Sequence, residues 1–95
     1  MTLNVTNQLT LLYDLLDEQK LESSGNVSEY QQIKRLVKSM MANNSITDEQ
    51  LLELLPEIYN YGKQGENAQN VPEHITANGQ NIDTWIRAIQ QTNLE

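Results

Sequence analysis

SEYQQIKRLVKSMMANN, residues 28–44, sets the pattern that decides the fold. Its apolar side chains recur every three or four positions, the spacing that gathers them on one face of an α-helix. These apolar residues are Tyr30, Ile33, Leu36, Val37, Met40 and Met41. A capping box between Ser28 and Gln31 predicts the helix start, because each side chain can bond a free backbone amide. Asn43 or Asn44 can adopt the left-handed conformation that predicts its end.

The segment before this stretch has the same period. In residues 4–21 the apolar arc covers more than half of the helix circumference, which predicts a helix packed against at least two neighbours. Gly25 follows it and is a natural left-handed terminator or turn residue, since glycine adopts the left-handed conformation without steric cost.

A third helix is predicted after the central stretch. Thr47 and Gln50 form a second capping box, and Gly62 is predicted to end the helix. Pro56 lies on the polar side of this pattern and removes one backbone amide from the helix interior. Because the apolar period continues past Pro56, a kink is expected there rather than a domain boundary.

The fourth helical pattern follows a polar segment, residues 63–70, which we expect to be the longest loop. Pro72 suits the first position of a helix that runs to about residue 92. Gly79 allows two interpretations. We expect the helix to continue through it, while a break at Asn78 and Gly79 is the alternative.

The fold class follows from the number of helices and the length of their connections. Four helices joined by short or medium loops imply alternating directions. We therefore predict an all-α, four-helix up-down bundle-like single domain over residues 1–93, with the third helix kinked at Pro56. Residues 94–95, Leu-Glu, are expected to be the scar of a tag linker.

Composition narrows the possible functions. The formal net charge is −7, so the surface as a whole repels nucleic acid and anionic membranes. The 95 residues contain no cysteine, which excludes disulfides and thiolate chemistry. No apolar run has the length of a membrane helix, and we expect a cytoplasmic protein without a membrane partner.

The candidate binding residues are basic. Lys34, Arg35 and Lys38, half of the six basic residues, lie opposite the apolar face of the central helix. One interpretation is an ordinary solvated helix face. The other is a partner-binding site, for a protein partner or for self-association. A weak nucleic-acid or nucleotide site is a second functional hypothesis, although three charges neutralise few phosphates.

Two further hypotheses have little support in the sequence. A DNA-binding helix-turn-helix would present the acidic face of the third helix, including Glu53 and Glu57, to the phosphate backbone. His74, the single histidine, has no companions at catalytic or metal-ligand spacing, so we interpret it as a partly exposed residue at the edge of the core. We predict no enzyme, and no catalytic, cofactor-binding or metal-binding residue.

Two segments resemble a known family. GNVSEYQQIKRLVKSMMANNSI, residues 25–46, and NQLTLLYDLL, residues 7–16, are similar to the YtzH-like family of small proteins from Bacillus and its relatives. Some members have cysteine in the loop where this chain has Ser23 and Ser24. The resemblance implies a cytoplasmic bacterial protein of about this length, and it brings no activity, ligand or functional residue. Our leading hypothesis is a non-enzymatic helical interaction module.

Overall fold

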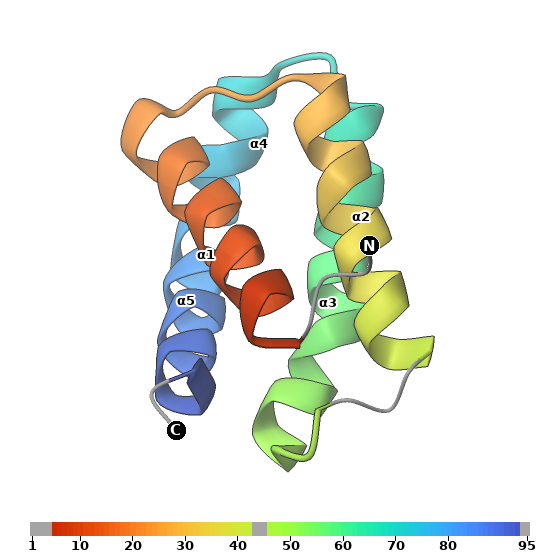
Figure 1. The fold of residues 1–95 in the computed structure, drawn as a ribbon. Coiled ribbons are helices and arrows are strands. Elements are labelled where there is room, and N and C mark those ends of the chain that lie inside the picture. Colours follow the sequence, from red (N-terminus) through yellow and green to blue (C-terminus); the bar gives the residue numbers. More distant parts are fainter. Residues whose placement is uncertain (1–4, 43–45, 94–95) are drawn as a thin grey trace.

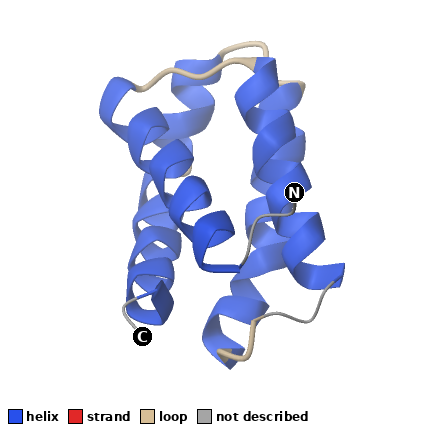
Figure 2. Cartoon of the chain, in the orientation of Figure 1, coloured by secondary structure: helices blue, strands red, loops and turns tan. Residues whose placement is uncertain are grey.

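The computed structural model describes residues 5–42 and 46–93, and every regular element in these residues is an α-helix (Figure 2). The all-α prediction is therefore confirmed. The helices are α1 (Val5–Glu22), α2 (Val27–Ala42), α3 (Glu49–Glu66), α4 (Val71–Ala77) and α5 (Gly79–Asn93). The helix end expected at Asn43 or Asn44 and the expected linker scar at residues 94–95 lie outside the described residues.

Successive long helices run in opposite directions (Figure 1). The most extensive packing joins α2 to α3, and the next most extensive joins α1 to α5. The short α4 lies where α3 ends, and the chain then turns back along α5 (Figure 1). Because α1 contacts α2, α4 and α5, the prediction that its broad apolar arc meets several neighbours is confirmed.

The expected fourth helix is two helices, so the described residues contain five rather than four. Asn78 separates them: its side-chain amide donates to the His74 carbonyl at 2.9 Å, which ends α4. The Asn78 carbonyl accepts the Ile82 amide at 2.8 Å, which begins α5. A Cβ atom at Gly79 would meet nothing within 4 Å, so this glycine does not serve close helix packing. The break at Asn78 is thus the alternative that the structure adopts.

The third helix is longer than predicted, because α3 continues through Gly62 to Glu66. Gly62 and Gly65 are buried and face α2. A Cβ atom at Gly65 would overlap the ring of Tyr30, and one at Gly62 would lie 3.2 Å from the Tyr30 carbonyl oxygen. Both glycines therefore allow two helices to approach closely and do not end α3. The helix also includes Pro56, where a kink stays a prediction.

The helix starts differ from the predicted capping boxes. The Asn26 side chain accepts the Glu29 amide at 2.9 Å, so α2 begins before Ser28. Asp48 accepts the Leu51 amide at 3.1 Å, so it replaces Thr47 as the cap of α3. Asparagine and aspartate cap helices at least as well as serine and threonine do. Pro72, expected at the first position of its helix, is the second residue of α4, since the helix begins at Val71 after the Asn70 cap.

The end of α1 also corrects a prediction. The residue with positive φ is Ser23, at 49°, and no described glycine has a positive φ. Gly25 instead lies close to a side chain of α1, since a Cβ atom there would lie 2.8 Å from Gln19 Nε2. The loop between α1 and α2 therefore lies directly against the Gln19 side chain.

One hydrophobic core draws side chains from all five helices. Its fully covered members include Leu12, Leu16, Ile33, Val37, Met40, Leu51, Leu55, Ile58, Ile75, Ile82 and Ile89. Leu52, an apolar residue of α3, is 38% exposed. The predicted apolar face of residues 28–41 is buried apart from Met41, which packs partly against the core.

Candidate functional site

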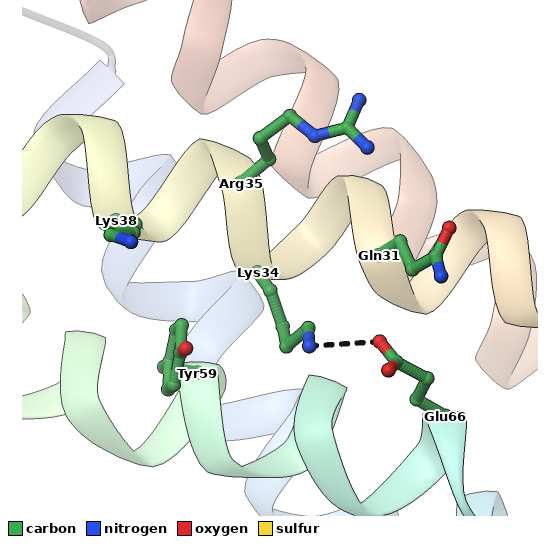
Figure 3. Close-up of a pocket in the computed structure, with 6 residues that line it drawn as sticks. All are labelled: Gln31, Lys34, Arg35, Lys38, Tyr59 and Glu66. Carbon is green, nitrogen blue, oxygen red and sulfur yellow. Dashed lines mark ion pairs between the residues drawn. The ribbon is translucent and has the colours of Figure 1, made fainter.

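The structure brings the three predicted basic residues to one open pocket between α2 and α3. The pocket has a volume of about 300 Å³. Its lining from α2 is Gln31, Lys34, Arg35 and Lys38, and α3 contributes Tyr59 and Glu66 (Figure 3). The helical spacing of residues 28–44 predicts the three cations of this site, whereas Tyr59 and Glu66 join them through the packing of α3 on α2. We call these six residues the basic pocket.

The close approach of α2 and α3 positions the lysine at the centre of the pocket. A Cβ atom at Gly62 would lie 2.9 Å from Lys34 Cγ, so the aliphatic part of Lys34 lies over this glycine. The ammonium group then reaches Glu66, with Lys34 Nζ 2.8 Å from Glu66 Oε2. In Figure 3 the two side chains point toward one another across the space between the helices.

The other two cations of the basic pocket are placed differently. Arg35 and Lys38 are exposed, and within the described part of the chain neither forms an ion pair. Arg35 points away from Glu66, to the opposite side of α2 (Figure 3). Tyr59, on α3, is half-buried. The pocket thus combines one internally paired cation with two exposed cations, of which Arg35 is directed away from the Lys34–Glu66 pair.

A second feature lies inside the core, where aromatic rings from four helices meet. The ring of Tyr61 stacks on that of His74, with centroids 4.9 Å apart and planes 13° apart. Tyr30 and Trp85 contact Tyr61 edge-on. His74 is half-buried beside these rings, which agrees with the expectation of a histidine at the edge of the core.

Gln19 is a buried polar residue that is not among the candidates predicted from the sequence. It is 1% exposed and accepts the Tyr61 hydroxyl at 2.7 Å. Its amide group donates to Glu29 at 3.4 Å. A signal was present in the sequence, because Gln19 lies one helical turn after Leu15 and Leu16 and so falls on the apolar face of α1.

The two buried tyrosines are poor candidates for acid–base chemistry. Burial raises the pKa of both Tyr30 and Tyr61 above the ordinary value of 10.0. The Tyr30 hydroxyl is also buried without a hydrogen-bond partner in the described residues. Both groups therefore stay protonated near neutral pH and act as packing residues.

A smaller hollow of about 210 Å³ lies beside Tyr61 and Trp85, between α3 and α5. Its rim is polar and consists of Glu57, Asn60, Gln64, Asn78 and Asn81. Within residues 5–42 and 46–93, no three side chains of the metal-binding types lie close enough to hold an ion. The described helices also include none with the length and apolar character needed to cross a membrane.

Comparison with known proteins gives a family. The sequence model of the YtzH-like protein family matches residues 3–89. The chain is also 31% identical over 86 residues to a protein of Bacillus subtilis (strain 168), "Uncharacterized protein YtzH". That alignment covers 90% of this chain and 92% of the relative. No solved structure matches the chain. The resemblance seen in residues 7–16 and 25–46 is thus confirmed, and the chain belongs to the YtzH-like family.

Proposed function

We propose that this protein is a non-enzymatic interaction module that binds an acidic segment of a partner protein in the basic pocket. The observation that carries the proposal is the pair of exposed cations, Arg35 and Lys38, which have no ion-pair partner within the described residues. They lie at one pocket with the half-buried Tyr59, on a protein whose net charge is −7.

The charge distribution favours a short acidic segment over an extended polyanion. A peptide with a few carboxylates can contact Arg35 and Lys38 without approaching the acidic surface elsewhere. A nucleic acid presents a continuous row of phosphates, and most of this row would face repelling carboxylates. Nucleotide or nucleic-acid binding is therefore the alternative that the test must distinguish.

Self-association has less support. A symmetric dimer would need an apolar face left uncovered in the single chain. On α1, however, Leu9, Leu12, Leu15 and Leu16 are buried inside the chain. We further propose that residues 1–93 act as one bundle-like domain in the cytoplasm, since all five helices contribute to one core and the chain lacks cysteine.

A peptide titration tests the proposed function. The probe is a fluorescein-labelled alanine-based helical peptide with glutamates three and four residues apart, followed by fluorescence anisotropy at low ionic strength. Arg35→Glu/Lys38→Glu should weaken binding about tenfold or more, because two attractive pairs become repulsive. Lys63→Glu/Arg87→Glu is the matched control. It changes the net charge equally at two exposed residues outside the basic pocket and should leave the affinity close to that of the original protein.

Three results would contradict the proposal. One is no binding of the glutamate peptide, and another is equal weakening by the two double variants. The third is binding of a single-stranded RNA oligonucleotide more tightly than the peptide, with a steep salt dependence, which would favour the nucleic-acid alternative. A peptide with glutamine in place of every glutamate controls for binding that does not depend on charge.

A further inference from the structure

The basic pocket contains a carboxylate of its own. Glu66 Oε2 is buried and lies 2.8 Å from Lys34 Nζ. Both side chains are 24% exposed, so water screens this pair less than it would screen an ion pair on an open surface. Glu66 is therefore placed where a carboxylate from outside would bind Lys34.

Glu66 is also held in a position that does not favour a negative charge. It is the last residue of α3, and the C-terminal end of a helix carries a partial negative charge. The helix dipole therefore opposes the Glu66 carboxylate, while Lys34 attracts it. If another carboxylate took its place on Lys34, Glu66 could turn toward solvent and lose little beyond the ion pair itself.

We propose that Glu66 occupies the position of a partner carboxylate and that binding exchanges the two on Lys34. This inference rests on the proposed function, and it specifies the ligand. The partner segment then carries at least three carboxylates, which bind Lys34, Arg35 and Lys38. In the free protein Glu66 keeps Lys34 paired and places a negative charge in the pocket, which lowers the affinity for any anion.

If the two carboxylates exchange on Lys34, Glu66→Gln should raise the affinity for the glutamate peptide. This variant keeps the size of the side chain but releases Lys34 and removes the competing charge. Affinity for the glutamate peptide should rise about fivefold, the equivalent of one ion pair of moderate strength. Glu53→Gln is the matched control. It removes one negative charge from an exposed position of α3 outside the pocket and should raise the affinity far less.

The same Glu66→Gln substitution is also made in the Lys34→Gln variant. This comparison distinguishes exchange on Lys34 from a general gain in positive charge. In Lys34→Gln, the lysine that both carboxylates would share is absent, so adding Glu66→Gln should no longer tighten binding. Circular dichroism melts of all variants establish that each is folded.

The outcomes of this experiment and of the previous one are distinct. Loss of tightening in the Lys34→Gln background supports the exchange. Equal affinities of the original protein and Glu66→Gln would overturn it, and so would equal tightening with and without Lys34. Either result leaves the proposed function in place if the original protein binds the glutamate peptide. Absence of any binding to that peptide would instead overturn both.

Discussion

Gly65 on α3 lies directly against the ring of Tyr30 on α2, and a Cβ atom at Gly65 would overlap the ring at Cε1, Cδ1 and Cζ. Tyr30 is fully buried, so its ring cannot move away from α3 without displacing other side chains of the core. The contact fixes the distance between α2 and α3, and the basic pocket is formed by these same two helices. Packing in the core therefore sets the spacing of the cations from Tyr59 and Glu66.

Replacing this glycine should destabilise the fold. Gly65→Ala adds one methyl group against Tyr30, and overpacking of this kind typically costs ~1–3 kcal/mol. The better helix propensity of alanine returns up to ~1 kcal/mol, so a net loss of about 1–2 kcal/mol in the free energy of unfolding is expected. Urea unfolding followed by circular dichroism measures this change.

Gly79→Ala is the control for that experiment. Nothing lies within 4 Å of a Cβ atom at Gly79, and its φ is not positive. The free energy of unfolding of Gly79→Ala should be unchanged or higher by up to ~1 kcal/mol. If both alanine variants lost the same stability, the close approach of Gly65 and Tyr30 would not explain the result.

Asp48, and not Thr47, caps the start of α3, and removing its side chain tests this. Asp48 accepts the Leu51 amide, and its second carboxylate oxygen accepts the Thr92 hydroxyl at 3.1 Å. Asp48→Ala should therefore lower the free energy of unfolding by about 1–2 kcal/mol. Thr47→Ala should change it by less than about 0.5 kcal/mol, because Thr47 is exposed and not the cap. Chemical denaturation of the two variants measures which residue caps α3. A larger loss in the free energy of unfolding for Thr47→Ala than for Asp48→Ala would support the capping box expected from the sequence.

The buried tyrosines predict a loss of stability at alkaline pH. Burial raises the folded-state pKa of Tyr30 and Tyr61 above 10.0, the value expected for an unfolded chain. Above pH 10 the unfolded chain releases these protons and the folded protein keeps them. The stabilisation is therefore complete below pH 10 and is lost as the pH rises toward the folded-state pKa, by at most about 1.4 kcal/mol per pH unit for each tyrosine.

Urea unfolding from about pH 8.5 to about pH 11 measures this dependence. Tyr61→Phe is the informative variant, because it removes one of the two ionising groups and should make the decline of stability with pH shallower. Tyrosinate absorbance should show that part of the signal from the four tyrosines appears only when the protein unfolds. A slope that is identical in Tyr61→Phe would contradict the assignment to Tyr61.

The helical period of the sequence predicts the helical segments and most of the core, but it does not predict the break at Asn78 between α4 and α5. Tyr30, Ile33, Val37 and Met40 share one face because of their spacing alone, and all four are buried. The ends of the helices were less predictable, since several residues near each start can cap it. Asn26 lies two residues before Ser28, and Asp48 follows Thr47 directly, so local sequence offers two possible starts in each case.

Glycines were difficult to interpret from the sequence, because a glycine can either end a helix or allow two helices to approach closely. Gly62 was expected to end a helix, but it provides space beneath Lys34. That use depends on which helix lies opposite, and the sequence of α3 alone does not contain this information. The basic pocket was predicted only in part for the same reason: Lys34, Arg35 and Lys38 share one helix, whereas Tyr59 and Glu66 join them through tertiary packing.

Binding of an acidic segment in the basic pocket is tested most directly by a two-dimensional ¹⁵N–¹H NMR titration of the protein with the glutamate peptide. If the basic pocket binds acidic segments, the largest shift changes should fall on the amides of Gln31, Arg35, Lys38, Tyr59 and Glu66. The same changes should be absent from Arg35→Glu/Lys38→Glu and present in Lys63→Glu/Arg87→Glu. Shift changes concentrated on α5 or beside Trp85, with the amides of the basic pocket unmoved, would contradict the account.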